Sequence, residues 1–213
     1  MTTLPAVSSL HRRALLGNLI ACAMLGGAGL PLAACGGSDP TYYTLAFIPG
    51  TAAPGGPLNL EVRTPTITPS LQRDHIVRNN ADYRLVTIKD AAWADSLDEL
   101  IGRTLALDLN QRLPGTAVFT QGSAISNSPA LLVELDVEHF AADTEGRAEL
   151  QATISVHKPD SGPGITRSLH LHLEPTGPGT SELVGALSAL VGQVADQIAT
   201  MARTVPPAAL PPA

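Results

Sequence analysis

The sequence has 213 residues, and its 19 Asp and Glu residues outnumber its 13 Lys and Arg residues. The formal net charge of −6 argues against a nucleic-acid partner, which needs a basic face, and against attachment to anionic lipids through a polybasic patch. The length suits a single domain with a substantial hydrophobic core, preceded by a targeting segment.

The first 35 residues have the layout of a secretory signal. A short cationic stretch at 11–13 is followed by an uncharged apolar segment at 14–30, and small residues precede Cys35. These are the positive, apolar and cleavage regions of an export leader. The ending Leu32-Ala33-Ala34-Cys35 resembles the lipobox of bacterial lipoproteins. We therefore expect residues 1–34 to be removed as a signal peptide and Cys35 to carry the lipid.

Two alternatives stay open for this leader. The apolar segment could be a transmembrane helix, although its glycines and its short length disfavour a span, or the cysteine could follow an ordinary cleaved signal. Arg12 and Arg13 also resemble a twin-arginine signal, so both the Sec and the Tat routes are open. Cleavage would remove Cys22 with the leader, so packing rather than a disulfide must stabilise the domain.

The folded domain is expected at 41–203, after a lipidated tether at 35–40. Residues 42–47 are rich in β-forming side chains and predict a first strand. Alternating apolar and polar residues at 58–62 predict a second strand with one solvent-facing side. A further short strand is expected at 83–88.

A long amphipathic helix is expected from Trp93 to Leu113. Apolar residues recur there every four positions, namely Trp93, Leu97, Ile101, Leu105, Leu109 and Leu113. Asp90 is the expected N-cap, and Pro114-Gly115 would end the helix. Trp93 would then open the helix on its apolar side, as a core or interface anchor.

Three consecutive strands form the clearest β region. Residues 131–137, 148–156 and 168–173 each alternate between apolar and polar side chains, and polar turns at 143–146 and 158–164 separate them. Such a pattern is typical of an antiparallel meander with one apolar face. Its polar face would be solvated or would meet another chain.

A second amphipathic helix closes the domain. Its apolar stripe runs from Leu183 to Met201, Thr180 or Ser181 is the expected cap, and a Pro/Ala-rich tail follows at 204–213. Two such helices and a one-faced sheet predict an α+β fold: a two-layer sandwich in which both helices cover one face of a largely antiparallel sheet.

The sequence carries no catalytic signature, because it lacks a Gly-x-Ser-x-Gly elbow, a phosphate-binding loop and a His-Glu-x-x-His motif. His170 and His172 share one face of a predicted strand, as two metal ligands would, and His139 and His157 lie on neighbouring strands. A zinc site needs three or four ligands, and the sequence identifies no clear third. We therefore expect solvated imidazoles, and no catalytic residue, bound metal or cofactor.

Several segments, in order, resemble those of a known family. They are Tyr42-Tyr43-Thr44-Leu45, Leu60-Glu61-Val62 with Pro65 and Pro69, Leu71-Gln72-Arg73-Asp74-His75-Ile76-Val77-Arg78, Trp93-Ala94-Asp95-Ser96-Leu97, Val137-x-x-Phe140 and Gly146-x-Ala148-x-Leu150. Behind a lipobox, this series resembles the auxiliary lipoproteins of ABC-type intermembrane lipid transporters, of the PqiC type. The positions singled out as family-motif or structural residues are Tyr43, Arg78, Trp93 and Leu97. Gln72 departs from the family, which usually has an aspartate before the arginine.

The resemblance implies a non-enzymatic accessory subunit of a phospholipid transport system. It would be anchored through Cys35 to the periplasmic face of the outer membrane of a Gram-negative bacterium. Gly36 agrees with this location, since it is not the aspartate that retains enteric lipoproteins in the inner membrane. The implied partners are an MCE-domain protein, which spans the periplasm as a lipid-conducting tube, and further copies of the chain in a homo-oligomeric ring.

Two other functions are compatible with parts of this pattern. A structural or assembly lipoprotein of the envelope would share the lipobox and the small α+β domain but have no transport role. A periplasmic enzyme would need a nucleophile or a metal site, which the sequence does not reveal. The lipid carried, the direction of transport and the ring size stay open at this level.

Overall fold

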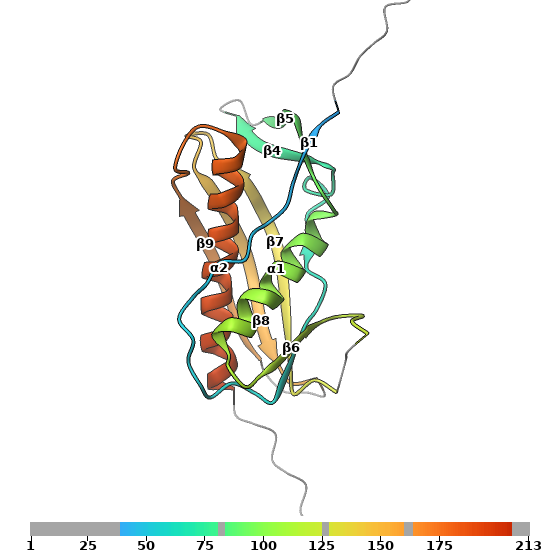
Figure 1. The fold of residues 1–213 in the computed structure, drawn as a ribbon, viewed down its shortest axis with the longest axis vertical. Helices are drawn as coiled ribbons and strands as arrows, with labels where there is room; N and C mark the ends of the chain where they lie inside the picture. Colours follow the sequence, from blue (N-terminus) through green and yellow to red (C-terminus); the bar gives the residue numbers. More distant parts are fainter. Residues whose placement is uncertain (1–38, 81–83, 125–127, 160–163, 206–213) are drawn as a thin grey trace, which may run out of the picture. The chain divides into compact units, whose positions relative to one another are not determined.

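The structure is a computed structural model that describes residues 39–80, 84–124, 128–159 and 164–205 (Figure 1). The expected signal peptide, Cys35 and nearly all of the expected tail lie outside these residues. The described chain forms a mixed α+β fold with one large, mostly antiparallel sheet and two helices. In chain order the elements are β1 (Thr41–Tyr43), β2 (Asn59–Val62), β3 (Thr66–Ile67), β4 (His75–Asn80), β5 (Arg84–Trp93), α1 (Leu97–Arg112), β6 (Ala117–Thr120), β7 (Leu131–Ala142), β8 (Ala148–His157), β9 (Ile165–Leu173) and α2 (Thr180–Thr204).

The long strand β7 organises the sheet. One of its edges pairs antiparallel with β8, which pairs antiparallel with β9, so the predicted meander is confirmed. Its other edge takes β2, β3 and β4 in turn, all parallel, because this stretch of chain runs alongside β7. Strand β6 then adds beside β2, β5 beside β4, and β1 beside β5.

A β-bulge interrupts the alternation of β7. Up to Val137 the odd-numbered residues are buried, but the pairing with β8 shifts between Val137 and His139. Beyond the shift Phe140 pairs with Leu150, which is buried on the core side of β8, and His139 pairs with the half-buried Gln151. The extra residue of a bulge re-aims the side chains that follow it. His139 therefore lies on the polar face of the sheet, whereas strict alternation would have directed it into the core.

The two helices complete the core. α2 contacts β7, β8 and β9, whereas α1 contacts β2 and β6 and packs against α2 (Figure 1). Among the described residues, α2 alone is long and apolar enough to cross a membrane, but 67% of its most apolar window is buried inside the fold, as in a core helix. The predicted arrangement in two layers, with both helices on one face, stays a prediction.

The expected start of the first helix is wrong. β5 continues to Trp93, and α1 begins only at Leu97, after Ser96 as N-cap. The Trp93 backbone N–H donates a hydrogen bond to the Asp74 carbonyl (2.6 Å), and its ring packs against Phe140 at a centroid distance of 6.3 Å. These long-range contacts hold Trp93 in the sheet despite its helical spacing from Leu97. Asp90 is consequently not a cap but lies within β5 at φ 54°.

Other boundaries also differ from the prediction. The first strand ends at Tyr43 rather than at residue 47, because the chain beyond it bonds to helix side chains instead of a strand. The Ala46 N–H donates to Ser188 Oγ on α2 (3.1 Å) and the Ile48 N–H to Asp108 Oδ1 on α1 (2.9 Å). At α2 the N-cap is Gly179, one residue before the nearer of the two expected caps.

Candidate functional site

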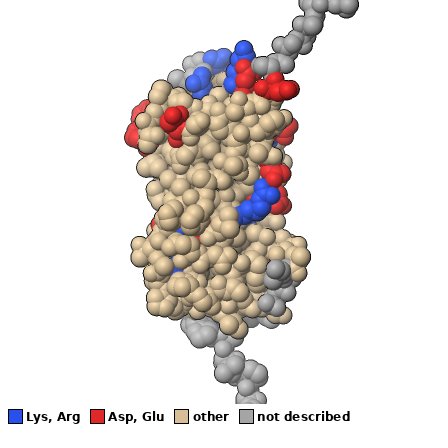
Figure 2. All heavy atoms as spheres, in the orientation of Figure 1, with Lys and Arg blue, Asp and Glu red and all other residues tan. Residues whose placement is uncertain are grey.

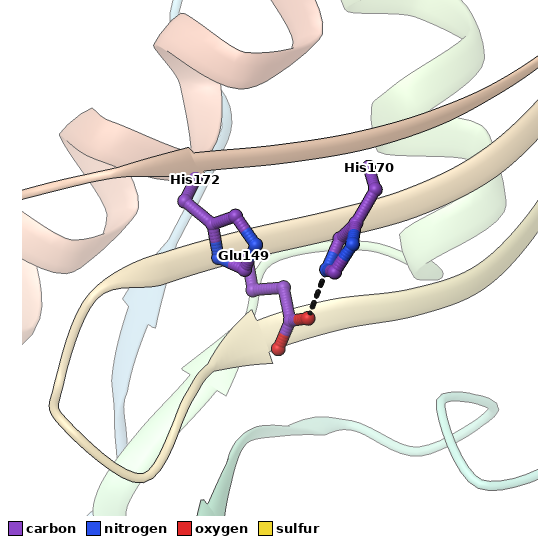
Figure 3. Close-up of side chains that lie close together, drawn as sticks. All are labelled: Glu149, His170 and His172. Carbon is purple, nitrogen blue, oxygen red and sulfur yellow. Dashed lines mark hydrogen bonds and ion pairs between the residues drawn. The ribbon is translucent and has the colours of Figure 1, made fainter.

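The polar face of β7, β8 and β9 carries a group of side chains that we call the histidine cluster: His139, Glu149, His170 and His172. The antiparallel register brings them together, since Glu149 lies opposite His172 and Gln151 lies opposite both His170 and His139. In Figure 3, His170 and His172 project from β9 toward Glu149 on the neighbouring strand.

The Glu149 carboxylate is the centre of the cluster. His170 Nε2 lies 2.7 Å from Oε1, which also accepts a hydrogen bond from Gln151 Nε2 (2.8 Å). His139 Nε2 lies 3.2 Å from Oε2 and 3.3 Å from Asn79 Nδ2. The rings of His170 and His172 are tilted against each other with centroids 4.3 Å apart. Both carboxylate oxygens therefore have imidazole partners from two different strands.

Burial differs sharply within the cluster. Only 11% of the Glu149 side chain is exposed, whereas 56% of the His170 side chain is accessible. Burial raises the pKa of Glu149, but the hydrogen bonds from His170 and Gln151 and the charges of the neighbouring imidazoles outweigh it, so the pKa lies below its usual value. Burial also lowers the pKa of His139, against the opposing charge of Glu149. The cluster thus combines an ionised, anchored carboxylate with imidazoles that solvent can reach.

A depression of about 570 Å³ adjoins the cluster. It lies between the end of β4, the turn at 142–146 and the segment 174–183. Asp143 orders that turn, because its carboxylate accepts the backbone N–H groups of Glu145 and Arg147 and bonds Arg147 Nε at 2.8 Å. Burial alone would raise the pKa of Asp143, yet these bonds and the Arg147 charge hold it below its usual value. Asp143 Oδ2 is also 4.0 Å from His172 Nδ1.

The residues singled out by family resemblance are not part of the histidine cluster. Tyr43 and Trp93 are register partners in β1 and β5, and the buried Leu97 begins α1 soon after. These three residues lie where the first strand, β5 and the start of α1 meet, and their contacts are those of strand pairing and core packing. Arg78, on β4, lies opposite Ala142 of β7 and lines the depression. Cys35 lies outside the described residues.

Sequence reasoning missed Glu149, the group that unites the histidines. His157, which was also considered, pairs instead with Glu134 (3.4 Å) toward the other end of β7 and β8. The available signal was the hairpin register: aligning residues 148–156 with residues 165–173 around their turn places Glu149 beside His172. Nothing local distinguishes Glu149 from the other acidic residues of the polar face.

The face that carries the helices has a different chemistry. In Figure 2 its charged atoms gather mainly toward the end where β4 and β5 lie, and much of the remaining surface carries no charge. The large hydrophobic side chains exposed in the described structure lie in α1, β1 or the segment between β1 and β2: Tyr42, Phe47, Leu58 and Leu107. Exposed apolar residues that are scattered singly are common on soluble proteins.

Comparisons with known proteins agree with the sequence resemblance. The chain is 28% identical over 187 residues to the intermembrane transport lipoprotein PqiC of Escherichia coli K12, a match covering 84% of this chain and 96% of the relative. The PqiC protein of Shigella flexneri matches to the same extent.

Two solved structures share the fold. The crystal structure of an uncharacterized protein matches with a TM-score of 0.65 and 22% identity, covering 76% of this chain and 98% of that one. Protein XCC0632 from Xanthomonas campestris matches with a TM-score of 0.60 and 15% identity, covering 75% and 92% of the two chains. The model of the family described as ABC-type transport auxiliary lipoprotein component matches residues 43–199, the greater part of the chain and nearly all of the described fold. This protein therefore belongs to the ABC-type transport auxiliary lipoprotein family.

Proposed function

We propose that this protein is a non-enzymatic accessory subunit of an MCE-type system that moves phospholipids between the membranes of a Gram-negative cell. The observation that carries the proposal is the similarity to PqiC over 84% of the chain, together with the family match. The sequence carries no catalytic motif, which supports a role in docking or conduction rather than in catalysis.

The proposed anchor is a lipid on Cys35, at the periplasmic face of the outer membrane. Two acyl chains suffice for stable attachment, because each buried methylene contributes about 0.8 kcal/mol. β1 begins at Thr41, so the connecting chain spans at most about 20 Å when extended. The domain would therefore stay within about that distance of the membrane surface, close enough to receive the end of a periplasm-spanning partner.

The proposed partners are an MCE-domain protein and further copies of this chain in a ring. Two features of the surface support contacts with other chains. Within the described residues β9 has a strand partner only on its β8 side, so its other edge is available for pairing. Much of the face seen in Figure 2 carries no charge, and depletion of charged residues is typical of the core of a protein–protein interface.

The partnership can be tested by co-purification. The tagged full-length protein, solubilised gently from its own cells, should retain an MCE-domain protein, and deletion of its gene should make the envelope sensitive to detergents without removing a metabolic reaction. His157→Ala serves as a matched variant with an altered polar face and should capture the partner as the wild type does. Fractionation into the inner membrane would contradict the outer-membrane docking role. Absence of any MCE-domain protein, while other envelope complexes survive, would favour a structural or assembly lipoprotein.

A further inference from the structure

We propose that Glu149, His170 and His172 form a binding site for a divalent transition-metal ion of the zinc class, on the polar face of β8 and β9. The assignment does not depend on the transport role. It rests on the convergence of three side chains of suitable chemistry, only two of which the sequence had brought together.

The geometry brings three potential ligand atoms to one point. One ring nitrogen of His170, one of His172 and one carboxylate oxygen of Glu149 all lie within 4.8 Å of one another (Figure 3). Tetrahedral zinc bonds of about 2.0–2.2 Å place neighbouring ligand atoms roughly 3.4 Å apart. Closing the site around an ion therefore requires the ligand atoms to approach one another by up to about 1.4 Å, through rotation of the two partly exposed imidazoles.

The donor set selects the class of metal. Two imidazole nitrogens and one carboxylate oxygen are a recurrent zinc set that leaves a fourth position open for water. Mg²⁺ and Ca²⁺ prefer oxygen ligands throughout, so two histidines disfavour them. The exposure of His170 and His172 leaves the fourth position facing solvent, where a water molecule or an external ligand can bind.

The surroundings hold the ligands in place. Glu149 is buried, and Gln151 Nε2 donates to its Oε1 while His139 Nε2 lies beside its Oε2. Asp143 Oδ2 lies 4.0 Å from His172 Nδ1. Hydrogen bonds to a ligating carboxylate orient it for the metal. The carboxylate is therefore the fixed element of the site, and the two histidines of β9 close on it.

The test is a Zn²⁺ titration of the full-length protein, purified in detergent and stripped of metal. We expect one Zn²⁺ per chain in competition with a chromogenic chelator, and a loss of affinity of about tenfold or more in His172→Ala and Glu149→Gln. His157→Ala is the matched control, because His157 also lies on β8 beside a carboxylate but has no second histidine near it in the described structure. Its affinity should equal that of the wild type.

Thermal unfolding separates loss of the site from loss of the fold. Without metal, His172→Ala should melt as the wild type does, since its side chain is partly exposed. Added Zn²⁺ should raise the melting temperature of the wild type and of His157→Ala but not that of His172→Ala, and Mg²⁺ should raise none of them. Equal Zn²⁺ affinity or an equal melting shift in His172→Ala would overturn the proposal, as would a wild type that binds no Zn²⁺, and the cluster would then be a hydrogen-bonded network only.

Discussion

Asp108 and Arg112 are polar residues buried where α1, α2 and the segment after β1 meet. All three guanidinium nitrogens of Arg112 donate hydrogen bonds. Its Nε donates to Asp196 (2.6 Å), and its other nitrogens donate to the carbonyls of Ile48 (2.8 Å) and Gly192 (3.0 Å). Asp108 is less well satisfied. Its Oδ1 accepts the Ile48 N–H, but Oδ2 has no hydrogen-bond partner among the described residues.

Burial raises the pKa of the Asp108 carboxyl, against the Ile48 hydrogen bond and the charge of Arg112. A folded-state pKa above the unfolded value means that the stabilisation is complete below about pH 4 and is lost as pH rises through the folded-state pKa. Asp108→Asn keeps an oxygen for Ile48 without a charge. Wild type should therefore lose unfolding free energy relative to this variant as the pH rises from about 4 through the folded-state pKa, in denaturant titrations followed by circular dichroism.

Asp108→Ala is the control for the hydrogen bond. It removes the acceptor of the Ile48 N–H and should lower the free energy of unfolding by about 1–3 kcal/mol across the pH range. A difference between wild type and Asp108→Asn that does not change with pH would show that the carboxyl is not perturbed by burial.

At the scale of secondary structure, α1 is defined by the contrast between its two sides. Leu105 is 0% exposed within the core, whereas Leu107, two positions along, is 57% exposed. Residues two apart do not share a helix face, so the two leucines report on opposite environments within one turn. Comparing the two positions therefore isolates the effect of burial, since only Leu105 is buried.

Leu105→Ala should destabilise the domain by roughly 2–5 kcal/mol, because it removes buried methyl groups and leaves a cavity. The matched variant Leu107→Ala should change the free energy of unfolding by no more than about 0.5 kcal/mol. Denaturant unfolding of both variants provides the measurement. Equal effects of the two substitutions would mean that α1 does not pack against the core as described.

For the whole molecule, we expect attachment and folding to be separable. The buried core of the described structure runs from Leu45 to Ala202, all of it after Cys35 in the chain. Loss of the lipid should therefore change where the protein resides and leave the fold intact.

Cys35→Ala should yield an unprocessed or soluble form in place of a membrane-bound lipoprotein, because the modified thiol is required before the leader is cleaved. Fractionation and mass spectrometry of the mature N-terminus provide the measurement. An unmodified Cys35 on mature wild-type protein would contradict lipidation.

Local patterns predicted much of this fold. The alternation at 131–137, 148–156 and 168–173 led to the confirmed meander, and the apolar stripes of α1 and α2 identified residues that are indeed buried. The ordered family segments led to the family that the comparisons show. These successes share a cause: the period of apolar residues reports which side of an element faces the core, and that is a property of neighbouring positions.

Long-range pairing decided the rest. Hydrogen bonding to Asp74 and packing on Phe140 keep Trp93 in β5, the bulge after Val137 turns His139 to the polar face, and the β8–β9 register places Glu149 beside His172. None of these is visible in a short window of residues, because each depends on which distant segment supplies the partner. The sequence by itself determined the core-facing stripes and the family, whereas only the tertiary structure decided which polar side chains meet, since a register shift of one residue moves every side chain of a strand to the opposite face.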